Sequence, residues 1–325
     1  MAIPLGDPAG IGPEIVAWAW TRASCAGLPP FFAIGDPACL SAGGFGAWQV
    51  IRSPDEAAGV FPLALPVLAV QGAGAIRLGQ PDPAGARVAL DSLELGVGLV
   101  REGAAGALVT GPIAKANMYE IGFRYPGQTE FVAERCGVAA ENIAMMLVSE
   151  ALTTSPVTIH LALRDVFDAL TTDFIVARGR VVAKALVRDF GIAAPRIAVA
   201  GLNPHAGEGG ALGREEIEII APAVALLREE GIDARGPLPA DTMFDARARA
   251  TYDAALCMYH DQALVPIKTI AFDEGVNFTA GLPIVRTSPD HGTAFGIAGK
   301  GLARPDAMIA AIRVAAACAV RRLAG

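Results

Sequence analysis

Short apolar runs alternate with amphipathic stretches along most of the chain. Apolar residues recur at helical spacing over residues 84–102 and 172–190, which predicts two long amphipathic helices. The runs predicted as strands are residues 1–5, 29–34, 65–70, 107–109, 143–148, 156–159, 197–202 and 254–258. Because strands and helices alternate, the pattern predicts an α/β fold with a largely parallel sheet.

Composition sets the scale of the fold and excludes some partners. The 325 residues are 53% apolar, which allows a large core in one big domain or in two lobes. Only 18% are charged, the formal net charge is −7, and no basic block is visible, so nucleic acid is not expected as a partner. An acidic protein must bind anions through local groups and not through its overall field.

Cysteine usage and the hydrophobic runs predict a cytoplasmic protein. The five cysteines form no CxxC motif, which fits a reducing compartment. The start of the chain lacks the pattern of a secretory signal. Residues 58–76 form an uncharged run long enough to span a bilayer, but its prolines and glycines favour a loop and a strand.

The histidines are the first candidates for chemistry. The chain has four, and three of them, His160, His205 and His260, directly follow apolar runs predicted as strands. Strand ends are where α/β folds place functional groups, and a catalytic ion needs about three protein ligands. The pattern therefore suggests a metal site, while three unrelated histidines on polar loops remain the alternative because the spacing forms no local motif.

A glycine-rich turn at residues 6–14 joins the first strand to a helix. It either makes a tight connection or presents backbone amides to a ligand. It is not a dinucleotide fingerprint, because GxGxxG is absent and the carboxylates of Asp7 and Glu14 are expected to repel phosphate. Further along, Gln128 and Thr129 offer neutral hydrogen bonds, or Thr129 caps a helix.

Several long motifs resemble one known family, that of 4-hydroxythreonine-4-phosphate dehydrogenase of pyridoxal phosphate biosynthesis. They are Gly6-Asp7-Pro8-Ala9-Gly10-Ile11-Gly12-Pro13-Glu14, Gly201-Leu202-Asn203-Pro204-His205-Ala206-Gly207-Glu208, Tyr259-His260-Asp261-Gln262 and Arg286-Thr287-Ser288-Pro289-Asp290-His291-Gly292-Thr293-Ala294. The resemblance runs nearly end to end. Both chain ends also resemble the wider isopropylmalate and isocitrate dehydrogenase fold.

The resemblance implies a two-lobed α/β/α enzyme without a Rossmann fingerprint. Residues 1–125 and 288–325 would form a nucleotide-side lobe, and residues 126–287 a lobe for metal, substrate and dimerisation, with the active site in the cleft between them. The loop of residues 291–301 would hold the adenosine end of NAD or NADP. The implied cofactor-binding residues are His291, Gly292, Gly296 and Gly299.

The resemblance also implies the remaining site residues. His160, His205 and His260 would bind one divalent ion (Zn, Mg or Co) in an active site shared across a homodimer. Asp241 and Asp261 would lie near the metal, with catalytic roles, and Lys268 is a candidate for proton transfer or for anchoring the substrate. The implied substrate contacts are Gln128, Thr129, Lys268, Asn277 and Arg286.

The implied reaction is metal-dependent, NAD(P)-linked oxidation of 4-phosphohydroxy-L-threonine, followed by decarboxylation of the β-keto acid. Two departures from the family pattern keep alternatives open. Gln128 stands where the family usually has His, so a paralogue acting on threonate or erythronate phosphate, or on a cis-dihydrodiol carboxylate, is the second hypothesis. Gly296 stands where the wider fold often has Asp, which leaves NAD and NADP open. A metal-bound hydrolase or binding protein without redox chemistry is the third hypothesis.

Overall fold

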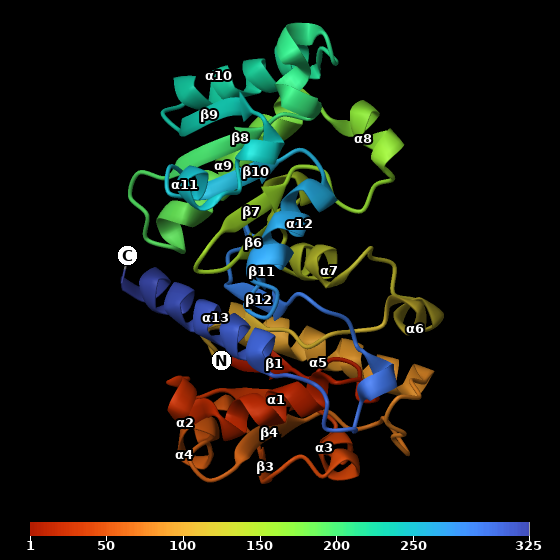
Figure 1. Ribbon diagram of the computed structural model, residues 1–325. Coiled ribbons are helices and arrows are strands. Elements are labelled where there is room, and N and C mark those ends of the chain that lie inside the picture. Colours follow the sequence, from red (N-terminus) through yellow and green to blue (C-terminus); the bar gives the residue numbers. More distant parts are fainter. Residues whose placement is uncertain (325) are drawn as a thin grey trace. The chain divides into compact units, whose positions relative to one another are not determined.

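The structure, a computed structural model, describes residues 1–324 and divides into two compact units (Figure 1). Unit 1 comprises Met1–Gly137 and Pro283–Val320, and unit 2 comprises Val138–Leu282 with the chain end from Arg321. The sequence predicted boundaries at 125/126 and 287/288. Gln128, Thr129 and Arg286 therefore belong to unit 1, whereas the prediction grouped them with the metal-binding residues. The functions predicted for the two lobes stay predictions.

The sheet of unit 1 is parallel throughout. Its strands follow the order β3-β4-β2-β1-β5-β12. Apolar side chains such as Ile3, Ile34 and Leu108 are fully buried in this sheet, as expected for strands covered on both faces. The strands are β1 (Ala2–Pro4), β2 (Phe32–Gly35), β3 (Trp48–Ile51), β4 (Leu65–Ala69), β5 (Leu108–Val109) and β12 (Arg286–Pro289).

Helix α5 shows how the sequence determines the helices of unit 1. Asp82 caps its first turn by accepting a 2.7 Å hydrogen bond from the Gly85 amide, and Val88, Leu93 and Val97 bury one stripe. The other helices of this unit are short, except α1 and α13. The bounds are α1 (Gly12–Thr21), α2 (Ala23–Ala26), α3 (Pro37–Gly43), α4 (Ala57–Val60), α5 (Pro83–Arg101), α6 (Lys115–Glu120), α7 (Gln128–Arg135) and α13 (Asp306–Ala324), with 3₁₀ turns η1 (Pro54–Glu56) and η6 (Phe295–Ile297).

The sheet of unit 2 is mixed, with strand order β11-β6-β7-β10-β8-β9. The pairs β11/β6 and β6/β7 are antiparallel, and the pairs β7/β10, β10/β8 and β8/β9 are parallel. The strands are β6 (Ala144–Val148), β7 (Thr153–Pro156), β8 (Arg196–Ala200), β9 (Asp233–Leu238), β10 (Ala254–Cys257) and β11 (Val276–Ala280).

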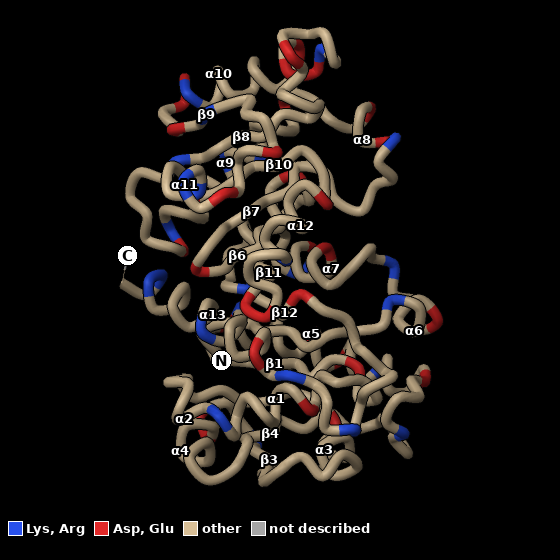
Figure 2. The backbone as a smooth tube through the Cα atoms, viewed as in Figure 1, with Lys and Arg blue, Asp and Glu red and all other residues tan. Residues whose placement is uncertain are grey.

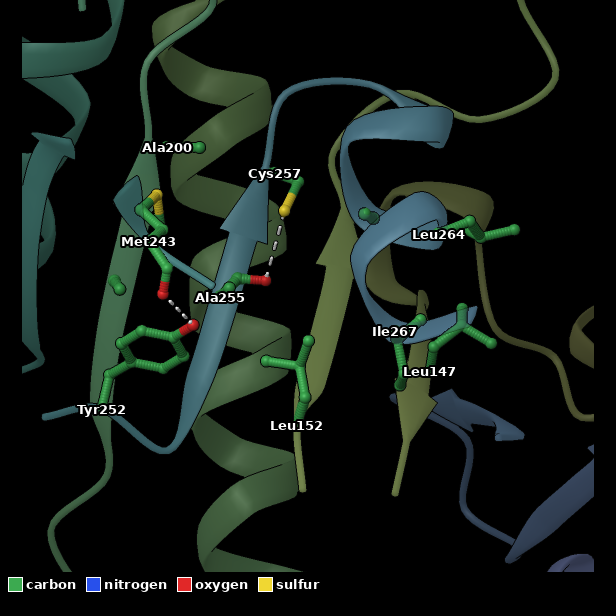
Figure 3. Packing of buried hydrophobic residues seen from close by; sticks show 11 residues of the cluster. Leu147, Leu152, Ala200, Met243, Tyr252, Ala255, Cys257, Leu264 and Ile267 are labelled. Atoms are coloured by element: carbon green, nitrogen blue, oxygen red, sulfur yellow. Dashed lines mark hydrogen bonds between the residues drawn. The ribbon is translucent and has the colours of Figure 1, made fainter. Parts of the chain in front are cut away.

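A hydrophobic cluster in unit 2 anchors helix α12 against strands β10 and β7. Leu264 and Ile267 of α12 pack with Leu147 and Leu152, and the Tyr252 hydroxyl donates a 2.8 Å hydrogen bond to the Met243 carbonyl (Figure 3). This packing fixes the start of α12, where His260 lies. The elements between the strands are η2 (Ala140–Asn142), α8 (Leu163–Ala169), α9 (Thr172–Arg188), η3 (Pro204–Gly210), the π-helical turn η4 (Glu216–Ile220), α10 (Ala221–Glu229), η5 (Ala240–Thr242), α11 (Ala246–Arg249) and α12 (His260–Ile270).

The predicted α/β class and the largely parallel pairing are confirmed, with the two antiparallel pairs as the exception. The run at 58–76 is a short helix, a turn and strand β4, and within residues 1–324 no helix is long and apolar enough to cross a bilayer. Acidic and basic residues are interspersed along both units (Figure 2). Strand β7 lies earlier than the predicted 156–159, and strands β3, β9, β11 and β12 were not predicted.

Candidate active site

The three strands that precede the candidate histidines are neighbours in unit 2. Strand β10 pairs in parallel with β7 on one side and with β8 on the other. His160 follows β7, His260 follows β10 and His205 follows β8, so all three lie beyond carboxyl ends of adjacent strands. The backbone pairing continues past β7, because the Val157 amide donates to the Cys257 carbonyl at 2.7 Å.

His160 and His260 come together at this end of the sheet. Their ring centroids are 5.9 Å apart, and both rings line a cavity of about 330 Å³ together with Thr158, Tyr259 and Asp261. His260 Nδ1 lies 2.8 Å from Asp261 Oδ1. A carboxylate at this distance orients an imidazole and leaves Nε2 for a ligand, which is the arrangement found behind metal-binding histidines.

His205 lies in a left-handed turn. The φ angles of His205, Ala206 and Glu208 are 53°, 51° and 44°, and His160 also has a φ of 53°. For a residue with a side chain this conformation costs roughly 1–2 kcal/mol, and such strain is typical of functional sites. Two of the three predicted metal ligands therefore have a backbone conformation that only a specific tertiary structure maintains.

Glu216 holds the start of this turn. Its buried carboxylate accepts hydrogen bonds of 2.7 Å from the backbone amides of Leu202 and Asn203 and of 2.9 Å from Asn203 Nδ2. The sequence gave no sign of this contact. Its negative charge is stabilised by donors from the loop that it fixes.

Gln262 connects two of the strand ends. Its Oε1 accepts from the Met258 amide at 2.7 Å, and its Nε2 donates to the Gly201 carbonyl at 2.8 Å. Both ends of the side-chain amide are used, so this buried residue ties the start of the His205 loop to the start of α12. The motif Tyr259-His260-Asp261-Gln262 included this residue, but its role was not predicted.

The histidines fit a metal ion only in part. Two imidazoles on one ion at metal–nitrogen distances of about 2.0–2.1 Å have centroids roughly 5–6.5 Å apart, which matches His160 and His260. However, residues 1–324 contain no group of three or more His, Cys, Asp or Glu side chains arranged to hold a metal. His205 and Asp241 are both exposed, and the turn η5 that carries Asp241 contacts the turn η3 that carries His205.

In unit 1, Arg286 lies buried at the start of β12 between Thr110 and Thr129, and we call these three residues the arginine cradle. Its side chain donates from Nη2 to Thr110 Oγ1 at 2.8 Å and from Nη1 to Thr129 Oγ1 at 3.2 Å. Arg286 is only 3% exposed. Burial lowers the pKa of Arg286 to about 10, an effect that the nearby Glu130 carboxylate opposes. The guanidinium therefore stays charged at neutral pH in a desolvated position.

Two predicted substrate contacts sit beside each other at the start of α7. Gln128 Nε2 donates a 3.0 Å hydrogen bond to the Gly111 carbonyl, which fixes the side-chain amide. Thr129, the next residue, holds Arg286. The structure therefore brings together Gln128, Thr129 and Arg286, as the resemblance implies.

Lys268 and Asn277, the other predicted substrate contacts, are half-buried in unit 2. Lys268 lies in the last turn of α12, and Asn277 lies in β11. Asn277 Oδ1 is buried and accepts no hydrogen bond from any group within residues 1–324. An unused buried acceptor of this kind calls for an explanation, and a donor on a ligand would supply one.

The predicted cofactor loop packs against the glycine-rich turn of unit 1. The Gly299 amide donates to Glu14 Oε2 at 3.0 Å, and the Ile11 amide donates to the Thr293 carbonyl at 2.9 Å. His291 is exposed, and its Nδ1 lies 3.0 Å from the Gly292 carbonyl. A Cβ on Gly292 or Gly296 would meet open space.

The carboxylates of the glycine-rich turn are structural. Glu14 is fully buried, and Asp7 Oδ1 accepts from the Ala9 amide at 3.0 Å while burial raises the pKa of Asp7. Both carboxylates are buried, and their expected repulsion of phosphate stays a prediction. The link from Glu14 to Gly299 was missed, because it joins residues at opposite ends of the chain.

Comparisons with known proteins agree with the motifs. A family model described as "Pyridoxal phosphate biosynthetic protein PdxA" matches residues 30–315. A 4-hydroxythreonine-4-phosphate dehydrogenase of Zymomonas mobilis is 55% identical over 324 residues, covering 100% of this chain and 97% of the relative.

Solved structures with similar folds include two dehydrogenases. The 4-hydroxythreonine-4-phosphate dehydrogenase of Klebsiella pneumoniae is 36% identical, with 98% of each chain covered and a TM-score of 0.86. A terephthalate 1,2-cis-dihydrodiol dehydrogenase of Burkholderia xenovorans is 29% identical, with 97% of this chain and 96% of that chain covered and a TM-score of 0.66. The resemblance predicted from the motifs is confirmed.

Proposed function

Because the chain belongs to the family of the pyridoxal phosphate biosynthetic protein PdxA, we propose that it oxidises 4-hydroxythreonine 4-phosphate (4-phosphohydroxy-L-threonine). The prediction of an enzyme, an oxidoreductase of the dehydrogenase type, is confirmed by the family. The product would be 2-amino-3-oxo-4-phosphohydroxybutyrate, which loses CO₂ to give 3-amino-2-oxopropyl phosphate. The substrate hydroxyl loses its proton, and the carbon that carries this hydroxyl loses a hydride to the nicotinamide cofactor.

The observation that carries the proposal is the buried guanidinium of Arg286. A desolvated cation held by two threonine hydroxyls is suited to bind an anionic group, and arginine binds phosphate or carboxylate through two parallel hydrogen bonds. Gln128 and Thr129 lie next to it and add neutral groups. Lys268 and Asn277 are the further substrate contacts in this proposal. Asn277 Oδ1 is available to accept a hydrogen bond from the substrate.

His160, His205 and His260 are the proposed ligands of one divalent ion (Zn, Mg or Co). A bound ion would lower the pKa of the substrate hydroxyl and polarise the carbonyl that replaces it. Asp261 orients His260 through the 2.8 Å contact. Asp241 is proposed to act near the same ligands, and Lys268 is the candidate that takes up or returns a proton.

A nicotinamide cofactor follows from the dehydrogenase family, and its role is to accept the hydride. The loop with His291, Gly292, Gly296 and Gly299 is the proposed binding segment for NAD or NADP. Gly296 places no acidic side chain there to repel a 2′-phosphate, so both cofactors belong in the assay. The five free cysteines support a cytoplasmic location.

We also propose a homodimer that completes the active site. Exposed apolar side chains surround the histidine pair: Leu161 and Leu163 line its cavity, Phe167 lies farther along α8, and Val265 lies on α12. Such side chains are typical of a surface covered by another protein. Co-expression of R286M and H205N, two variants expected to be inactive, tests whether the two subunits share the active site. Activity in the mixed dimer requires that Arg286 and His205 of one site come from different subunits, and an inactive mixed dimer contradicts sharing of this pair.

A dehydrogenase assay tests the proposed function. Purified protein is incubated with 4-hydroxythreonine 4-phosphate, NAD or NADP, and Zn²⁺, Mg²⁺ or Co²⁺ after complete chelation. We expect reduced cofactor only when a metal is restored. Turnover that survives chelation rejects the metal role, and absence of turnover under every condition rejects the function.

Gln128 favours a second candidate within the same family. A glutamine cannot become cationic, so it can give a phosphate only a neutral hydrogen bond, whereas the histidine that the family usually has can also carry a positive charge. The candidate substrates are threonate or erythronate phosphate and a cis-dihydrodiol carboxylate, the substrate type named for the Burkholderia relative. The same assay with these compounds, for the wild type and for Gln128→His, distinguishes the two candidates by kcat/KM.

A further inference from the structure

We infer that Thr110 is a positioning residue that fixes the guanidinium of Arg286 for the anionic group of the substrate. The inference rests on the proposed function and concerns a residue that lies outside the contacts named for it. Thr110 is 1% exposed, and its Oγ1 accepts the shorter of the two hydrogen bonds from Arg286 to threonine hydroxyls, 2.8 Å against 3.2 Å.

Strand register explains why Thr110 can reach Arg286. In the parallel pair β5/β12, Arg286 lies opposite Leu108, and Thr287 lies opposite Val109. Side chains two residues apart in an extended chain point to the same face, so Thr110 follows Leu108 on the face that carries Arg286. The Thr110 amide donates to the Thr287 carbonyl at 3.0 Å, which fixes the backbone of the acceptor.

The chemical character of Thr110 matters as well as its position. Its hydroxyl and that of Thr129 are neutral acceptors, so they direct the planar guanidinium without themselves cancelling its positive charge. A buried arginine held in this way is oriented before the substrate arrives, which lowers the entropic cost of binding.

Two substitutions separate this role from a structural one. Thr110→Val keeps the shape of the side chain and removes the acceptor, whereas Thr110→Ser keeps the acceptor. Because a hydrogen bond to a charged group typically contributes a factor of about 10–100 in an equilibrium constant, we expect T110V to raise KM for the phosphorylated substrate by that factor with little change in kcat. T110S should remain within about threefold of the wild type.

A double-mutant cycle shows whether Thr110 acts through Arg286. If it does, T110V adds nothing in an R286M background, because the group that it positions is gone. Equal losses from T110V in both backgrounds overturn the inference, as does a T110V enzyme with normal KM. A T110V protein with lower thermal stability but an unchanged KM has lost only a structural contact, which also overturns it.

The same variants give a result if the proposed function fails. Should the wild type oxidise none of the candidate substrates, the affinity for inorganic phosphate is measured by calorimetry. Binding by the wild type and by T110S that weakens about tenfold or more in T110V supports the positioning role. Equal affinity in all three proteins, or no phosphate binding by any of them, rejects it.

Discussion

The arginine cradle of unit 1 and the histidine pair of unit 2 differ in how completely one chain builds them. Arg286 is buried, and its hydrogen bonds to Thr110 and Thr129 are formed within the unit. His160 is exposed and His260 half-buried, and residues 1–324 offer no third ligand arranged with them. The hydrogen bonds that hold the proposed anion-binding guanidinium therefore lie within one unit, whereas only two of the three proposed metal ligands lie close together.

Burial accounts for the difference. A buried guanidinium without acceptors would cost several kcal/mol, about 3–5 where one member of a buried charged pair is removed, so folding itself demands its partners. An exposed imidazole is solvated by water and imposes no such demand. Folding of one chain therefore does not have to bring exposed metal ligands together, because binding of the ion or of another subunit can do so.

The largest expected effect comes from Arg286→Met. This change removes the charge and leaves the hydroxyls of Thr110 and Thr129 without their donor. Truncating one partner of a buried charged contact costs roughly 2–5 kcal/mol, so kcat/KM for the phosphorylated substrate should fall about 10³-fold. Steady-state kinetics measure it, with Arg313→Met, an exposed arginine on α13, as the control. A loss below about tenfold would remove Arg286 from the substrate site.

A smaller effect is expected from Asp261→Asn in unit 2. The substitution weakens the contact that orients His260, and residues behind metal ligands typically contribute 10–100-fold to metal affinity. Competition with a chelating dye measures the affinity, and Asp168→Asn, an exposed carboxylate on α8, is the matched control. Unchanged metal affinity in D261N would show that this pair does not help to hold an ion, and the comparison would then concern an anion site alone.

Glu14→Leu tests whether the proposed cofactor loop is fixed by a buried hydrogen bond within the chain, as Arg286 is, and not left exposed like the histidine pair. Like Arg286, Glu14 is fully buried and bonded, here to the Gly299 amide at 3.0 Å. Loss of this bond should loosen the loop and raise KM for the nicotinamide cofactor about tenfold, while KM for the substrate stays constant. Glu14→Gln, which keeps an acceptor, is the control. Equal changes in both KM values would contradict a role specific to the cofactor loop.

The sequence predicted the elements whose side chains follow a regular period. Helix α9 runs from Thr172 to Arg188, against a predicted 172–190, because its apolar stripe is continuous. Strand β7 was placed too late, since the sequence Thr153-Thr154-Ser155-Pro156 is mostly polar. The structure buries Thr154 and Ser155 by satisfying their hydroxyls at the carbonyls of Ala263 and Met145, at 3.0 Å and 2.8 Å.

The same limit applies to the site. The histidines were found because each follows an apolar run, which is a local signal. The contacts of Thr110 with Arg286, 176 positions apart, and of Glu14 with Gly299 exist only after the sheet and loops have assembled. No local pattern marks a threonine as the acceptor for one distant arginine, so the residues that position the site could not be predicted from spacing.

Arg196 offers the contrast to Arg286 and the smallest expected effect. Its guanidinium donates to both carboxylate oxygens of Asp253, at 3.1 Å and 2.9 Å, so its charge is largely cancelled and its role is structural. The hydrogen bond from Arg196 is the main reason why the pKa of Asp253 lies below its ordinary value of 3.8. The folded state therefore holds this carboxyl ionised at a pH at which the unfolded chain has already begun to protonate it.

The sign of the effect follows from that direction. The contribution of Asp253 to stability is fully present above pH 3.8 and is lost as the pH falls through the lower pKa of the folded protein. Asp253→Asn should lower Tm by about 1–2 °C near pH 7, since a partly exposed pair is screened by solvent, and should have no effect on KM. Asp165→Asn, from the exposed pair with Arg164, is the control and should leave Tm unchanged. A D253N enzyme with a raised KM would show that the Arg196–Asp253 pair contributes to substrate binding. The purely structural role assigned to Arg196 would then be wrong.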